Sequence, residues 1–131
     1  VVIGMFLSND QWHKQAMEIM NAIDSDKGSS VIITDFILAE ILNFLQRKGS
    51  HEIALDCLAR LEENANITID RIDDRQFAVG KDINYRQYPR LSFVDALTIA
   101  YMKEKRIRYI YSFDSDFDGI EGIMRLSTPR R

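Results

Sequence analysis

Hydrophobic and polar residues of this chain alternate between a helical period and a strand period. Apolar residues from Trp12 to Ile23 recur at helical spacing, and the polar stretch Asp24 to Ser30 predicts a loop after them. The β-branched run Val31 to Thr34 predicts a strand, which leads into a helix from about Phe36 to Lys48, closed by Gly49. The chain therefore opens as helix, strand and helix.

The rest of the chain continues this alternation. Gly80 weakens one of the predicted helices, and Pro89 breaks the chain before the next one begins. The further elements predicted, in chain order, are helix Glu52 to Glu63, strand Asn66 to Ile72, a helix capped by Asp73 or Asp74 that runs towards Tyr85, a helix opening at Ser92, strand Ile107 to Ser112 and strand Ile123 to Leu126. Alternating strands and helices predict an α/β protein, a three-layer α/β/α fold with a mainly parallel central sheet.

Length and composition set bounds on the class of protein. With 131 residues, 46% hydrophobic and 28% charged, we expect a single globular domain over residues 1–131. Apolar runs are far shorter than the roughly 20 residues that span a bilayer, and one cysteine cannot build a disulfide framework. We therefore expect a cytoplasmic protein. The net charge of −3 argues against bulk electrostatic coating of nucleic acid, but it permits a local basic patch.

Acidic residues occur where predicted strands end and predicted helices begin. Asp114 and Asp116 directly follow a predicted strand, and Asp95 lies early on a predicted helix. Glu40 falls at the edge of the apolar arc of an earlier helix, with Asn43 beside it. Because ligand crevices of open α/β sheets lie beyond the carboxyl ends of the strands, we expect these acids to share one site.

Each acid also has a purely structural interpretation. The alternative for Glu40 is a boundary glutamate whose carboxylate reaches water. Ser92, three residues before Asp95, is close to a capping box, in which the acid merely satisfies backbone donors. The run Asp114 to Gly119 matches the first half of a calcium-binding loop, but Arg125 occupies the twelfth position, where a glutamate is required.

The types of residue present narrow the chemistry. Crowded carboxylates raise one another's pKa unless a cation neutralises them, and an all-oxygen cluster favours Mg²⁺ or Mn²⁺ over zinc. We interpret His13 and His51 as surface residues and Cys57 as a small core residue. A triad hydrolase is disfavoured because no serine lies in a glycine elbow, and no phosphate-binding loop is present.

At this point the residues resemble a PIN domain, the fold of VapC-type toxin ribonucleases. The resemblance covers nearly the whole chain and depends on three segments, of which the last two together are fairly specific: Ala39 to Ile41 with Asn43, Leu91 to Ala96, and Ser112 to Phe117. It implies that four acids bind one or two divalent metals and activate water to cleave RNA: Glu40, Asp95, Asp114 and Asp116. It also implies a supporting role near the site for Ser112.

The chain departs from the family pattern at its start. That family opens with a strand ending in an aspartate, and Val1 to Phe6 looks like the apolar stretch that follows this strand. We therefore expect the first strand and its acidic ligand to lie N-terminal to Val1.

The leading functional hypothesis is a metal-dependent endoribonuclease that hydrolyses RNA phosphodiester bonds. The resemblance implies the toxin of a toxin and antitoxin pair, with an antitoxin protein as partner, and it favours a homodimer. The alternative is a catalytically inactive PIN-like module that binds RNA or a protein. Basic residues expected to steer the RNA are Arg86, Arg90, Lys103 and Arg106.

Overall fold

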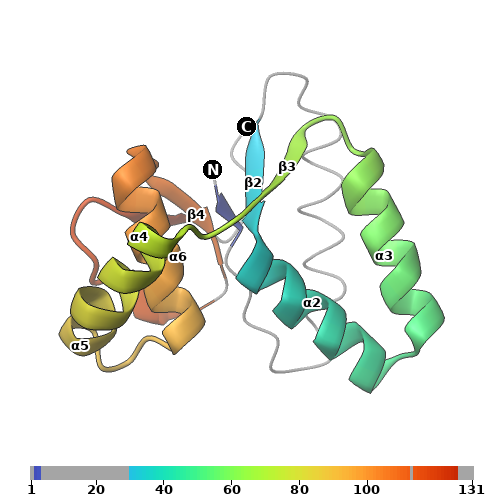
Figure 1. Cartoon of the computed structure of the whole chain (residues 1–131), viewed down its shortest axis with the longest axis horizontal. Helices are drawn as coiled ribbons and strands as arrows, with labels where there is room; N and C mark the ends of the chain where they lie inside the picture. The colour runs from blue at the N-terminus through green and yellow to red at the C-terminus, as the bar shows by residue number, and fades with distance from the viewer. Residues whose placement is uncertain (1, 4–29, 113, 127–131) are drawn as a thin grey trace.

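A five-stranded parallel sheet forms the centre of the molecule. The computed structural model describes residues 2–3, 30–112 and 114–126 (Figure 1). The strands have the order β3-β2-β1-β4-β5, and each neighbouring pair is parallel. Their bounds are β1 Val2–Ile3, β2 Val31–Thr34, β3 Ile67–Asp70, β4 Tyr109–Tyr111 and β5 Met124–Leu126. The predicted parallel sheet is confirmed.

The short strand β1 occupies the central position. Val2 pairs with Ile32 of β2 on one side and with Ile110 of β4 on the other. Without a strand between them, β2 and β4 would each have a row of buried backbone groups lacking partners. The structure thus places Val2–Ile3 in the sheet itself, whereas the sequence analysis interpreted this apolar stretch as following the first strand. A strand N-terminal to Val1 stays a prediction, as does its acidic ligand.

Helices cover both faces of the sheet. Figure 1 shows α2 and α3 on one side and α4, α5 and α6 on the other, which confirms the three-layer fold. Their bounds are α2 Asp35–Lys48, α3 His51–Glu63, α4 Asp74–Val79, the π-helix η1 Gly80–Asn84, α5 Tyr85–Gln87 and α6 Phe93–Lys105. The predicted helix Trp12 to Ile23 falls outside the described residues.

Alternation along β2 divides the core between the two faces. Val31 and Ile33 are 1% exposed and pack with apolar residues of α2 and α3, whereas Ile32 packs against the cluster of α6 and β4. Neighbouring side chains of a strand point to opposite faces, so one short run supplies both layers. Cys57 is half-buried against the α2 and α3 cluster, as predicted, and His51 is exposed. His13 lies outside the described residues.

Polar side chains define where the helices begin. The Thr34 hydroxyl accepts a hydrogen bond from the Ile37 amide at 3.3 Å, and the Ser50 hydroxyl accepts one from the Ile53 amide at 3.1 Å. Such caps satisfy amides that have no partner within the helix, and each contributes about 1 kcal/mol. The strand β2 therefore passes directly into α2 at Thr34.

The predicted helix that runs towards Tyr85 differs from the one observed. It begins as an α-helix but widens into the π-helix η1 at Gly80, which packs closely against α6. A Cβ at Gly80 would lie 2.7 Å from Leu97 Cδ2 and 3.0 Å from Leu97 Cα. Glycine is needed here for the close approach of two backbones, which helical spacing alone does not reveal.

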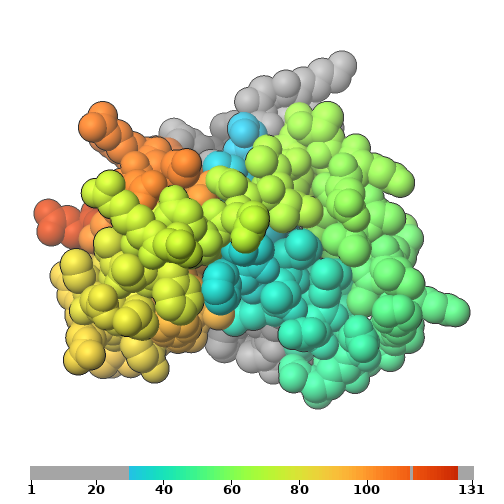
Figure 2. Space-filling model, viewed as in Figure 1, coloured from blue at the N-terminus to red at the C-terminus, as the bar shows by residue number. Residues whose placement is uncertain are grey.

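The segment that leaves β3 crosses the front of the molecule. Figure 2 shows it running across the surface over the beginning of α2. Asp35 Oδ1 accepts a hydrogen bond from the Ile72 amide at 3.0 Å, which ties this crossing to α2. Among the residues described, no helix has the length and apolar character needed to cross a membrane.

Candidate functional site

The loop after β4 presents two of the predicted acids. The Asp114 amide donates a hydrogen bond to Ser112 Oγ at 3.1 Å, and Asp114 Oδ1 accepts one from the Asp116 amide at 2.9 Å. The loop then forms a short 3₁₀ turn, Ser115–Phe117, whose Phe117 side chain is 1% exposed in the core. Both carboxylates therefore lie beyond the carboxyl end of a strand, on a loop anchored by a buried aromatic ring.

Asp95 combines a cap with a buried carboxylate. Its amide donates to Ser92 Oγ at 3.1 Å, and its carboxylate is hydrogen-bonded by Ser92 in turn, as the capping interpretation predicts. The residue is only 7% exposed. Burial is the main cause that raises the pKa of Asp95 to about 6. Hydrogen bonding to Ser92 lowers this pKa, and the charges of Asp114 and Asp116 raise it. Asp95 thus lies within electrostatic range of the loop after β4.

Glu40 lies on α2 and interacts electrostatically with Asp95 on α6. It lies in the second turn of α2 and is half-buried. Burial, and then the charge of Asp95, raise the pKa of Glu40 to about 7. This raised pKa is what partial burial beside a second carboxylate causes, and the role of Glu40 stays a prediction. The structure therefore joins α2, α6 and the loop after β4 through mutually repelling carboxylates.

The acids fit a divalent cation in chemistry, without forming a ready-made cage. Their donors are all oxygens, and repulsion among them is what a bound cation relieves. Among the described residues, however, no group of three or more His, Cys, Asp or Glu side chains is placed to hold a metal ion. The assignment of Glu40, Asp95, Asp114 and Asp116 as metal ligands stays a prediction.

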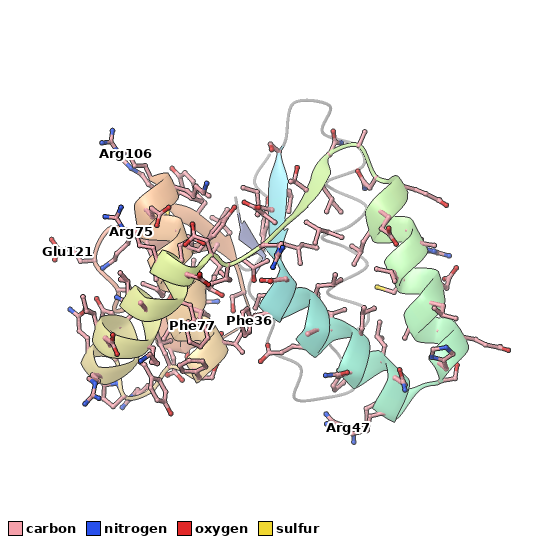
Figure 3. All side chains as sticks on the ribbon, in the orientation of Figure 1. Phe36, Arg47, Arg75, Phe77, Arg106 and Glu121 are labelled. Carbon is pink, nitrogen blue, oxygen red and sulfur yellow. The ribbon has the colours of Figure 1, made fainter. Side chains whose placement is uncertain are left out.

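The four predicted RNA-binding residues are placed unequally. Arg90 is 86% exposed at its side chain, and its Nη1 lies 4.0 Å from Asp116 Oδ1. Lys103 follows Asp95 by eight residues on α6, which corresponds to about 12 Å along the helix axis. Arg106 caps the C-terminal end of α6, well away from the helix start, as Figure 3 shows. Of this set, Arg90 is the residue paired with the acids.

The remaining sequence-based candidates lie on three different segments of the chain. Arg86 is exposed on α5. Asn43 is exposed on α2, one turn after Glu40 and therefore on a neighbouring part of the helix surface. Ser112 is 1% exposed, and its hydroxyl holds the Asp114 amide, so the structure gives it a contact to the loop that carries the acids.

Comparison with known proteins identifies the family. The PIN domain model matches residues 1–123. The chain belongs to the PIN domain family. A search of curated proteins found no significant match. Among solved structures, VapC20 of Mycobacterium tuberculosis, described as a sarcin-ricin loop cleaving toxin, superposes with a TM-score of 0.72 at 22% identity. The match covers 94% of this chain and 98% of VapC20, which supports the same fold.

A row of aromatic rings, which the sequence analysis missed, connects the helices of this PIN domain. The ring centroids lie 6.1 Å apart for Phe36 and Phe77, 5.6 Å for Phe77 and Phe93, and 5.3 Å for Phe93 and Tyr85. Figure 3 shows Phe36 and Phe77 side by side between α2 and α4. Phe36 precedes Glu40 by one turn, and Phe93 precedes Asp95 by two residues. The row therefore sets the spacing between the helices that carry these acids.

A cation of this PIN domain was also missed as a site residue. Arg125 was noted from sequence only because it spoils the calcium-loop match. In the structure, β5 pairs with β4 so that Arg125 lies opposite Ile110. Its hydrogen bond to Asp118 is the main cause that raises the pKa of Arg125, and the charge of Asp114 adds a smaller contribution. The signal available in the sequence was a single arginine in the last predicted strand, which becomes informative only once the strand order is known.

Proposed function

We propose that this PIN domain is a metal-dependent endoribonuclease that hydrolyses RNA phosphodiester bonds. The observation that carries the proposal is the electrostatic coupling of Glu40, Asp95 and Asp114 across three separate elements at the carboxyl edge of the sheet. Family membership and the shared fold of VapC20, a toxin that cleaves the sarcin-ricin loop, support it. We extend the proposal to a cytoplasmic toxin that is controlled by an antitoxin protein.

The residues that would hold Mg²⁺ or Mn²⁺ are Glu40, Asp95, Asp114 and Asp116. When bound, the ion would lower the pKa of a water molecule and offset charge on the phosphoryl oxygens. Within the protein, the Ser92 hydroxyl accepts a hydrogen bond from the Asp95 amide at the start of α6, and the Ser112 hydroxyl accepts one from the Asp114 amide. These contacts hold the carboxylates in place before substrate arrives, which lowers the cost of ordering them.

An exposed cation beside the acids offsets repulsion between the acids and RNA. Arg90 pairs with Asp116 and has most of its side chain in water, so a phosphate of RNA can compete with Asp116 for its guanidinium. Arg86 lies nearby in the chain and is also exposed. Binding that depends on such phosphate contacts weakens as salt increases, so cleavage should slow at higher ionic strength.

The proposal is tested with full-length protein, a mixed RNA pool and Mn²⁺ or Mg²⁺. We expect cleavage that EDTA abolishes, and Asp114→Asn and Asp95→Asn should each lower the rate by at least about 100-fold through lost metal affinity or charge stabilisation. Asp56→Asn is the matched control, because Asp56 is an exposed residue of α3 paired with Arg60. An intact RNA pool, or full activity in Asp114→Asn, would overturn the nuclease proposal.

A binding module that does not cut RNA is the second candidate. The observation in its favour is that the described residues include no preformed group of three metal-binding side chains. Such a module would bind RNA equally well in EDTA and in Mn²⁺ and would leave it intact. Filter binding run beside the cleavage assay separates the two functions.

A further inference from the structure

One arginine side chain contacts the acid-bearing loop at two points. Arg125 Nε and Nη2 donate hydrogen bonds to the two carboxylate oxygens of Asp118 at 2.7 and 3.2 Å. Its Nη1 donates to the Ser112 carbonyl at 3.3 Å. Ser112 precedes Asp114 and Asp118 follows Asp116, so a single planar group holds both ends of the loop that carries the two predicted ligands.

The backbone beside this arginine strengthens the same connection. The Ser112 amide donates to the Leu126 carbonyl at 3.1 Å, so the start of the loop is joined to β5 through the main chain and the Arg125 side chain. The loop's own hydrogen bonds, from the Asp114 amide to Ser112 and from the Asp116 amide to Asp114, lie between the two anchored points. Release of either anchor would therefore loosen both carboxylates together.

We propose that Arg125 is a positioning residue of the site, acting through the loop to place Asp114 and Asp116; this rests on the proposed nuclease function. Isolated exposed ion pairs contribute little to stability, but a bidentate arginine fork with a third bond fixes geometry as well as charge. Arg125 is 21% exposed at its side chain, whereas Arg90 is 86% exposed. Arg125 is accordingly a clamp within the protein, and Arg90 is the cation available to substrate.

The first experiment measures the loop directly, in metal-free protein. Hydrogen exchange of the Asp114 and Asp116 amides reports on the bonds that Arg125 is proposed to protect. We expect Arg125→Lys, which keeps the charge and loses the fork, and Asp118→Asn, which loses the charged acceptor, to raise exchange of both amides about 10-fold or more. Asp118→Glu keeps a carboxylate and should retain most of the protection.

A matched ion pair elsewhere in the chain supplies the control. Arg60 Nε and Asp56 Oδ2 lie 3.2 Å apart on α3, with side chains 63% and 67% exposed. Arg60→Lys and Asp56→Asn should leave exchange of the Asp114 and Asp116 amides unchanged. The proposal is overturned if exchange of these amides is also unchanged in both Arg125→Lys and Asp118→Asn. It is overturned as well if Arg125→Lys alone protects the amides as well as the parent does, since a positive charge without the fork would then be sufficient.

The second experiment measures cleavage kinetics with the same variants. Arg125→Lys and Asp118→Asn should lower kcat by about 10-fold, with KM for RNA and the melting temperature close to those of the parent. A rise in KM at constant kcat would instead make Arg125 a substrate-binding residue and overturn the positioning role. If the parent cleaves no RNA, the nuclease proposal fails, while the exchange comparison still decides whether Arg125 orders the loop.

Discussion

Glu40 illustrates how a residue proposed for function can lower the stability of the fold. Burial and Asp95 raise its pKa to about 7 in the folded chain, whereas the ordinary value is 4.5. The folded state therefore holds this proton to higher pH than the unfolded state does. Stability contributed by Glu40 is unchanged below about pH 4.5, falls as pH rises from 4.5 to about 7, and remains reduced above that range.

We expect Glu40→Gln to stabilise the metal-free protein at pH 8. Glutamine has nearly the same shape without the charge, and the gain should be about 1–2 kcal/mol after allowance for solvent screening. Urea unfolding of parent and variant in EDTA at pH 4 and pH 8 measures the difference, which should vanish at the lower pH. Glu52→Gln, at an exposed position in the first turn of α3, is the control. Equal stability of Glu40→Gln and parent at pH 8 would contradict this reading of the site.

At the level of elements, the contact between η1 and α6 depends on Gly80. A Cβ there would meet Leu97 Cα at 3.0 Å and the Ala96 carbonyl oxygen at 3.3 Å, both of which are backbone atoms. We expect Gly80→Ala to lower the free energy of unfolding by about 1–3 kcal/mol, because one helix must move away from the other. Thermal and urea denaturation measure this change.

Gly119→Ala is the corresponding control, since a Cβ at Gly119 would meet nothing within 4 Å. It should change stability by less than about 0.5 kcal/mol. If both variants unfold at the same denaturant concentration, the close packing of η1 on α6 is not needed for stability.

Local chemistry explains which elements were predictable. Ser92 and Thr34 are strong caps, so the starts of α6 and α2 were predicted to within about two residues. The π-helix at Gly80 was not, because it results from packing against α6, a tertiary cause with no periodic signal. Asp114 follows a strand end and Asp95 lies in the first turn of a capped helix, and both positions can be recognised in the sequence. Arg125 gains its proposed role only from the pairing of β4 with β5.

At the level of the whole molecule, we expect a homodimer. Large apolar side chains remain exposed on separate helices of the described chain, among them Leu55 at 50% on α3 and Ile83 at 55% on η1. Burial of such groups between copies is favourable by roughly 25 cal/mol per Å². Light scattering at micromolar concentration should give twice the 15.2 kDa chain mass. Leu55→Asp and Ile83→Asp, measured separately, would show which face is involved, and a 15.2 kDa species in the parent would reject the dimer.

The central place of β1 has a consequence for the timing of synthesis. This strand comes first along the chain, yet one of its two neighbours is β4, which the ribosome adds more than a hundred residues later. Pairing over so long a separation forms late in folding. An emerging chain therefore holds Glu40 and Asp95 before the strand that presents Asp114 has joined the sheet. A protein proposed to destroy RNA thus acquires its complete set of described acids only after the ribosome has added β4 and the loop that follows it.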